Sequence, residues 1–200
     1  MFGWGWGFLG VGSWKLGVDV IDNEDQRRLL SLARRAIEAR VRREPPPAPD
    51  RGGALEALHG AFVTIHCHGD LRGCLGRLDP DEPLATTVAQ LAASVSDSDP
   101  RFEPVRPGEL DALEIEISVL TPEREVMSIA DVEVGRHGLM VDQGGRRGLL
   151  LPQVASEYGW DAETFVSQTC IKAGLPADAW RRGARILVFE AQVFGETRHL

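Results

Sequence analysis

The sequence predicts an α+β protein with a mainly antiparallel sheet and flanking helices built round one core. Its 43% apolar and 26% charged residues are typical of an ordinary globular protein, which argues against a disordered chain. Segments with strand alternation follow one another through short turns, and helical segments lie among them at irregular intervals. This order favours an antiparallel sheet over a parallel wound one. The chain is long enough for a single compact unit or for two subdomains.

Three segments have the periodicity and end signals of helices. The first begins near residue 21, where Asp22 and Asn23 are candidate N-caps and Gln26 completes a capping box with Asn23. It must end before the proline-rich stretch at 44–49. The same signals predict two further helices, at about 83–95 and 161–173, the latter capped by Asp161.

A β-hairpin is predicted over residues 61–78. Residues 61–68 alternate as a strand does, Gly69–Asp70 is a two-residue turn signal, and residues 71–78 return. The resulting register pairs His68 with Leu71, Cys67 with Arg72, and Ile65 with Cys74. Cys67 and Cys74 would then lie diagonally about 7 Å apart, too far for an unstrained disulfide. Other strands are expected at 113–120, at 139–141 and 148–151 round Gly144–Gly145, and at 186–194.

Charge and cysteine usage narrow the function classes. The formal net charge of −8 argues against a broad surface for nucleic acid or an anionic membrane. The three cysteines form no CxxC pair and suit no disulfide framework, which favours a reducing, cytoplasmic location. No apolar run approaches the roughly 18 residues of a membrane span. The local arginine groups, Arg146–Arg147 and Arg181, Arg182 and Arg185, are interpreted either as solvated turns or as an RNA contact.

The first segment, Met1–Val20, alternates glycine with tryptophan and phenylalanine. It lacks the basic start and the small-residue cleavage site of a secretory signal. Glycine at this density also disfavours a helix. We therefore expect an N-terminal arm outside the domain proper, with a binding segment as the alternative.

Six motifs in order resemble those of one known family. They are Leu71–Gly76 (LRGCLG), Asp99–Phe102 (DPRF), Glu114–Pro122 (EIEISVLTP), Gly135–Leu139 (GRHGL), Gly148–Val154 (GLLLPQV) and Cys170–Leu175 (CIKAGL), with Trp160 and the closing Phe194–Glu196 in keeping. The chain is similar to the AMMECR domain family, named after the Alport syndrome, midface hypoplasia and elliptocytosis chromosomal region. The resemblance covers residues 21–196, leaving the arm at 1–20 and a C-terminal tail at 197–200 outside.

The resemblance implies a barrel-like antiparallel sheet with flanking helices, and no established reaction. In microbes, members of the family look linked to a Memo-type protein, which resembles extradiol dioxygenases, and to a radical-SAM protein. A role in RNA modification has also been suggested for the family by prediction. No catalytic residue is therefore carried over, and the matched positions are candidates only.

Cys74 is the first candidate catalytic residue. Gly73 and Gly76 flank it and allow another backbone or a ligand to approach closely. Arg72, two residues away on the same strand face, would lower the thiol pKa. His137, in its own glycine-flanked loop, is the candidate base for a nucleophilic pair. The alternative is that Cys74 is a small buried apolar side chain and the glycines serve strand curvature.

Further candidate residues would bind a ligand. Arg101 could join Arg72 in holding a phosphate or carboxylate, and Gln153 could point into the same cleft. In the alternative, Asp99 caps a turn and pairs with Arg101. His66 and His68 form an HxH pair that could place two imidazoles on one metal, but no third ligand is evident, so no metal site is predicted. No nucleotide-binding glycine loop occurs, and no cofactor is predicted.

Three functions remain open at this point. The first is a cleft-containing enzyme, or an accessory subunit of one, that uses Cys74 with Arg72 and His137. Its cleft would be lined by Arg72, Cys74, Asp99, Arg101 and His137. The second is a non-catalytic module that binds a partner enzyme of the Memo or radical-SAM type. The third is a factor in RNA modification. The sequence predicts no oligomeric state.

Overall fold

The structure is a computed structural model that describes residues 21–79 and 81–196. The predicted arm at 1–20 and tail at 197–200 lie outside the described residues. The α+β class and the antiparallel pairing are confirmed by two four-stranded sheets, neither of which closes on itself within the described residues. Contacts divide the described residues into two compact units, one formed by residues 21–79, 81–119 and 192–196 and the other by Leu120–Ala191. The core is thus divided, as in the two-subdomain alternative.

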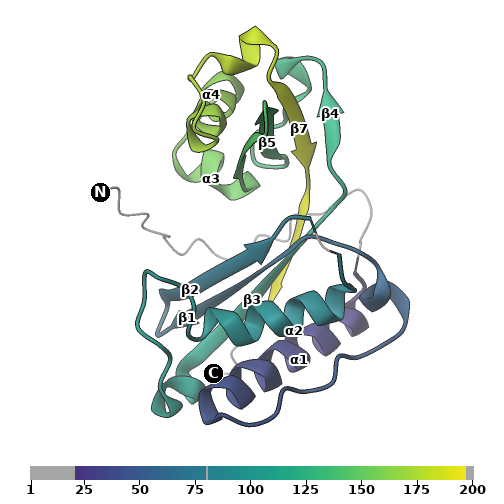
Figure 1. Ribbon diagram of the computed structural model, residues 1–200, viewed down its shortest axis with the longest axis vertical. Coiled ribbons are helices and arrows are strands. Elements are labelled where there is room, and N and C mark those ends of the chain that lie inside the picture. Colours follow the sequence, from purple (N-terminus) through teal and green to yellow (C-terminus); the bar gives the residue numbers. More distant parts are fainter. Residues whose placement is uncertain (1–20, 80, 197–200) are drawn as a thin grey trace. The chain divides into compact units, whose positions relative to one another are not determined.

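In the first unit, two helices cover one face of a sheet (Figure 1). The strand order is β2 (Asp70–Arg77), β1 (Ala61–Cys67), β3 (Leu113–Leu120) and β8 (Ala191–Gly195). Helix α2 (Leu84–Val95) packs on β1 and β2, and α1 (Asn23–Arg42) packs along α2. Alternate strand residues such as Val63, Ile65 and Ile117 are fully buried against the helices, so the remaining alternate residues lie on the other face.

The first helix begins one residue earlier than the predicted capping box requires. Asp22 is its N-cap, and its Oδ1 accepts hydrogen bonds from the N–H groups of Glu24 and Asp25. Gln26 instead donates through Nε2 to the carbonyl oxygen of Ile21 at 2.9 Å. The Asn23–Gln26 capping box is therefore wrong by one position.

The predicted register of the first hairpin is wrong. The turn is His68–Gly69, whose φ angles of +54° and +89° suit a type I′ turn with glycine second. Arg72 is then an extra, bulged residue, since Ile65 pairs with Gly73 while His66 pairs with Leu71. Observed pairs are Cys67 with Asp70, His66 with Leu71, Ile65 with Gly73 and Thr64 with Cys74.

The second unit contains the other sheet, ordered β4 (Arg124–Val126), β7 (Arg185–Phe189), β5 (Gly138–Gln143) and β6 (Arg146–Leu150). The predicted hairpin round Gly144–Gly145 is confirmed by the β5–β6 pair. Helix α4 (Ala162–Lys172) begins after Asp161, as predicted. Strand β4 and the short helix α3 (Pro152–Glu157) were not predicted, because three and six residues are too short to show a period.

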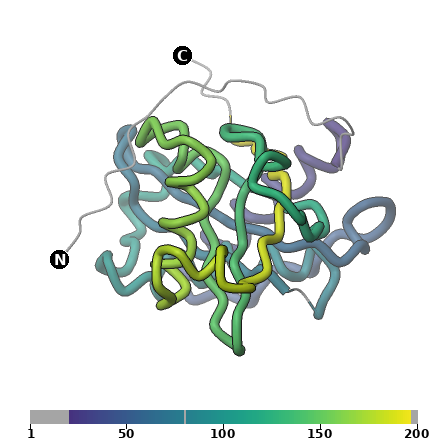
Figure 2. Tube along the Cα trace, turned by 90° about the horizontal axis from the view of Figure 1, so that it is seen from above, coloured from purple at the N-terminus to yellow at the C-terminus, as the bar shows by residue number. Residues whose placement is uncertain are grey.

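The last predicted strand, at 186–194, is two strands. It is interrupted at Glu190, so that β7 pairs with β4 and β5 while β8 joins the sheet of the first unit. The chain can be followed through this change of sheet in yellow in Figures 1 and 2. Continuous alternation along the sequence cannot reveal a change of partner.

Four short 3-10 helices connect these elements: η1 (Gly53–Glu56), η2 (Pro107–Ala112), η3 (Ile129–Asp131) and η4 (Ala179–Arg182). Within the described residues, no helix has the length and apolar character needed to cross a membrane.

Candidate functional site

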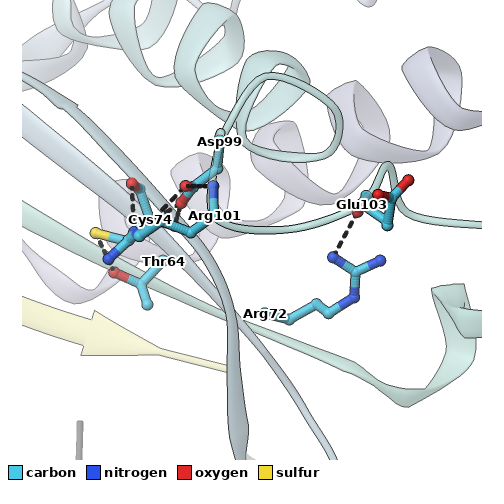
Figure 3. A network of polar contacts seen from close by, with 6 residues as sticks. All are labelled: Thr64, Arg72, Cys74, Asp99, Arg101 and Glu103. Atoms are coloured by element: carbon cyan, nitrogen blue, oxygen red, sulfur yellow. Dashed lines mark hydrogen bonds and ion pairs between the residues drawn. The ribbon is translucent and has the colours of Figure 1, made fainter. Parts of the chain in front are cut away.

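Cys74 is held by three polar side chains (Figure 3). It lies on β2, the edge strand of its sheet, where outward backbone groups lack a strand partner. Asp99 Oδ2 accepts from its N–H at 2.9 Å, and Arg101 Nη2 donates to its carbonyl oxygen at 3.3 Å. Thr64, opposite on β1, donates from its hydroxyl to the sulfur at 3.3 Å. The turn after α2 thus completes the sheet edge at Cys74.

Asp99 is the electrostatic centre of this network. Its side chain is only 3% exposed, and it accepts from the backbone N–H of Arg101 and from Arg101 Nε and Nη2, at 3.1, 2.9 and 2.7 Å. The hydrogen bonds from the Arg101 guanidinium, against the cost of burial, lower the pKa of the carboxyl to about 2. The local turn pairing of Asp99 with Arg101, proposed as one alternative, is therefore present.

The Cys74 thiol is not an activated thiolate. Burial raises its pKa, and this effect outweighs the hydrogen bond from Thr64 and the nearby charge of Arg101, both of which lower it. The expected lowering of the thiol pKa by Arg72 is wrong, since the guanidinium beside the thiol is that of Arg101. At neutral pH the residue is a protonated thiol.

Arg72 is directed to a different segment of the first unit. Its Nε donates to Glu109 Oε1 at 2.9 Å, and its Nη1 to the carbonyl oxygen of Glu103 at 2.8 Å. Its Nη2 donates to the carbonyl oxygen of Pro104 and to Glu109 Oε2, both at 3.3 Å. Arg72 is bulged out of the strand and clamps residues 103–109, which explains why it does not lie beside the sulfur.

Both glycines next to Cys74 allow a close approach by the protein itself. A Cβ at Gly73 would lie 3.0 Å from the carbonyl oxygen of Val95, at the end of α2. A Cβ at Gly76 would lie 2.1 Å from the ring of Phe62, the residue paired with it on β1. The glycines of the LRGCLG motif therefore have a packing role.

Thr64 and Glu116 were not predicted to lie near Cys74. Register places Cys74, Thr64 and Glu116 in one row across β2, β1 and β3, on the face opposite the helices. Burial raises the pKa of the Glu116 carboxyl. The alternation of residues 113–120 does not single out Glu116, because alternation cannot distinguish a solvated carboxylate from a half-buried one.

His137 belongs to the second unit and is held within its own turn. It is 4% exposed, and its Nδ1 accepts from the N–H of Glu133 at 3.0 Å. Burial lowers the pKa of the imidazole. Its neighbour Gly138 lies opposite Phe189, whose ring would be 2.2 Å from a Cβ there. Pairing of His137 with Cys74 stays a prediction.

The remaining candidates are placed as follows. Gln153 is half-buried in the first turn of α3, in the second unit, and its part in a ligand site also stays a prediction. His68 lies in the hairpin turn, so the HxH pair on one strand face is wrong. Within 21–79 and 81–196, no three His, Cys, Asp or Glu side chains are grouped to hold a metal ion. All three cysteines are free.

The arginine groups are paired with protein acceptors. Arg147 contacts Glu123, Arg185 contacts Glu125, Arg181 contacts Glu163 and Arg182 contacts Asp178. Arg146 donates to the carbonyl oxygen of Gly174 at 3.0 Å. These contacts favour the solvated-turn interpretation, because each positive charge except that of Arg146 has a carboxylate beside it.

Comparison with known proteins agrees with this architecture. The AMMECR1 family model matches residues 30–194. A protein from Methanothermobacter thermautotrophicus is 45% identical over 188 residues, covering 88% of this chain and 96% of its own. Protein MK0488 from Methanopyrus kandleri is 43% identical over 187 residues, covering 86% and 89%.

A solved structure has the same fold. The crystal structure of the uncharacterized protein PH0010 from Pyrococcus horikoshii superposes with a TM-score of 0.81 at 38% identity, covering 89% of this chain and 94% of the other. The order of motifs, the two antiparallel sheets and these matches lead to one conclusion: the chain belongs to the AMMECR1 family.

Proposed function

We propose that this protein is a small-molecule enzyme, or an accessory subunit of one, with its functional centre at the Cys74 thiol. The observation that carries the proposal is the placement of Cys74. Separate side chains hold its N–H, its carbonyl oxygen and its sulfur. An ordinary edge residue needs only its backbone groups satisfied, whereas here the sulfur is also oriented, by Thr64.

Each group then has a distinct chemical role. Cys74 is the nucleophile. It is a neutral thiol before reaction, because burial raises its pKa. Arg101, whose side chain is 44% exposed, stabilises negative charge that develops near the sulfur or on a bound substrate. Asp99 positions both residues through its buried carboxylate. Gly73 and Gly76 shape the strand, and His137 and Gln153 remain candidates of the second unit.

Alkylation of the native protein by iodoacetamide tests this proposal. The sulfur displaces iodide and the thiol proton passes to solvent, so the rate follows the thiolate fraction. We expect slow modification of Cys74 at pH 7 and a rate that is still rising above pH 9. Cys170, which is fully buried, is the internal control and should stay unmodified. A folded protein whose Cys74 resists the reagent even at pH 10 has no accessible thiol, and the proposal fails.

A non-catalytic binding module is the second candidate. It is favoured because Arg72, Asp99 and the two glycines hold the fold. It is also favoured because burial keeps the Cys74 thiol protonated. The family resemblance implies a Memo-type or radical-SAM protein as the partner. Co-purification from the native host with a Cys74→Ala variant separates the two candidates. A stable complex in which the variant also supports full partner activity favours the module.

RNA modification receives less support. The arginine groups that could contact phosphates are paired with carboxylates, and the chain carries a net charge of −8. An RNA-binding function predicts an affinity that falls steeply with salt. A filter-binding series in increasing salt with a structured RNA provides this measurement.

A further inference from the structure

The sheet face that carries the Cys74 sulfur also carries Glu116, a glutamate with no ion-pair partner among the described residues. Thr64 pairs with Cys74 on one side and with Glu116 on the other, so the three side chains point to the same face in one row. Neighbouring strands are about 4.8 Å apart, which separates the thiol and carboxyl positions by about 10 Å. Thr64 between them is 8% exposed, while Cys74 and Glu116 are half-buried.

Glu116 differs from the other acids round Cys74. Asp99 is paired with Arg101, and Glu109 with Arg72, whereas within 21–79 and 81–196 Glu116 has neither an ion pair nor a side-chain hydrogen bond. Burial without a partner raises the pKa of its carboxyl. A half-buried, unpaired carboxylate costs free energy that a counter-charge would recover.

The neighbour of Glu116 on the next strand is a glycine. The next strand presents Gly195, where an added Cβ would lie 3.8 Å from the Glu116 Cβ, and Gly195 is exposed. The row therefore runs from Cys74 through Thr64 and Glu116 to a residue with no side chain. At that end of the row, β8 therefore places no side chain beside Glu116.

We propose that Glu116 binds the cationic, amine-type group of a ligand whose other end lies at Cys74 and Arg101. This inference rests on the proposed function, since it names the chemical class of the ligand for the same site. Arg101 at one end favours an anionic or electron-rich group, and Glu116 at the other favours an ammonium. The ligand is thus a small bipolar molecule that spans about 10 Å, twice the spacing of neighbouring strands.

An organic amine fits this position better than a metal ion does. Metal sites need several protein ligands, and no group of three suitable side chains exists in the described part of the chain. A single carboxylate suffices for an ammonium group, which brings its own three donors.

The experiment compares two charged thiol reagents at Cys74. The cationic trimethylammonium-ethyl and the anionic sulfonato-ethyl methanethiosulfonates each transfer their thioalkyl group to the sulfur as a disulfide. Methanesulfinate leaves and the thiol proton passes to solvent. Rates are measured at pH 8 and low salt by mass spectrometry of the Cys74 peptide, in wild type and in Glu116→Gln. Any effect of Glu116 on the thiol itself is common to both reagents and cancels in their rate ratio.

In Glu116→Gln we expect the cationic reagent to slow and the anionic one to accelerate, each about 2-fold, so that the cation-to-anion ratio falls about 4-fold. Glu116→Asp should keep most of the wild-type ratio. Glu44→Gln, which removes one exposed negative charge outside this face, should leave the ratio unchanged. Glu116→Ser is a second neutral variant in case the glutamine protein does not fold.

The outcomes separate this inference from the proposed function. If both reagents modify Cys74 and neutral variants at 116 keep the wild-type ratio, Glu116 does not face the ligand and the inference is overturned. If neither reagent modifies Cys74 in the folded wild type, the proposed function fails with it.

Discussion

Cys74 in the first unit and His137 in the second share one sequence signal, an ionisable side chain next to glycines. In both regions a glycine lies opposite a phenylalanine on the paired strand, Gly76 opposite Phe62 and Gly138 opposite Phe189. A Cβ at either glycine would meet the ring at 2.1 or 2.2 Å. In both regions the glycine is therefore explained by the phenylalanine ring that packs on it from the paired strand.

The two regions differ in what holds the ionisable residue. Cys74 is held by side chains from a distant turn, Asp99 and Arg101, and its sulfur lies on a polar sheet face. His137 accepts a hydrogen bond at Nδ1 from the backbone N–H of Glu133, four residues away, so this ring nitrogen is already occupied. The two regions therefore differ in the origin of these contacts, which is long-range at Cys74 and local at His137.

The largest effect on stability is expected from removing Asp99, which accepts hydrogen bonds from Cys74 and Arg101. Asp99→Ala leaves the N–H of Cys74 and the guanidinium of Arg101 without their acceptor and should lower the free energy of unfolding by about 3 kcal/mol. Glu133→Ala is the matched change near His137. It should cost less than about 1 kcal/mol, because the backbone donor remains and only exposed ion pairs are lost. Urea denaturation measures both, and equal losses would remove the distinction between the regions.

Adding a methyl group at the two ring-facing glycines should have similar effects in both regions. Gly76→Ala and Gly138→Ala each force a phenylalanine ring to move and should cost about 2 kcal/mol. Gly108→Ala is the control, since no atom lies within 4 Å of the added Cβ, and it should be neutral or slightly stabilising. In a double-mutant cycle, Phe62→Ala should remove most of the Gly76→Ala penalty. Additive losses would contradict the ring-packing explanation.

Acid should weaken the first unit through Asp99. Its pKa is about 2 in the folded protein against an ordinary value of 3.8, so the unfolded chain binds the proton more readily. The carboxylate therefore contributes stability above about pH 4, of roughly 2 kcal/mol, that is lost as the pH falls towards 2. Asp99→Asn should flatten this part of the stability curve. An unchanged slope between pH 4 and 2 would mean that Asp99 is not the titrating group.

A smaller loss is expected at milder acidity in the second unit. Burial lowers the pKa of His137, so protonation favours the unfolded chain and stability falls as the pH drops below the ordinary value of 6.5. Hydrogen exchange of the Glu133 amide, which donates to the ring, should accelerate first, while the Cys74 amide stays protected until Asp99 titrates. Simultaneous loss of both protections would show that the two regions respond as one.

Much of the fold follows from local patterns. The helix spans at 84–95 and 162–172, the alternating strand β3 and the Gly144–Gly145 hairpin were predicted, because periodicity and turn residues are local properties. Of the five residues predicted to line one cleft, the structure brings Cys74, Asp99 and Arg101 together. Arg72 instead pairs with Glu109, and neither this pair nor the contact of Thr64 with the Cys74 sulfur was predicted.

The family, the α+β class and the candidate residues could be recognised from local sequence motifs and patterns alone. The register of the first hairpin required the folded structure, because alternation along the sequence shows neither the turn at His68–Gly69 nor the bulge at Arg72. The folded structure also decided that the edge of β2 is closed by Asp99 and Arg101 and that Glu116 stands in the row of Cys74. Strand register and the hydrogen bonds that cover the edge of β2 depend on contacts between segments far apart in the sequence. Such contacts produce no periodic pattern of residues.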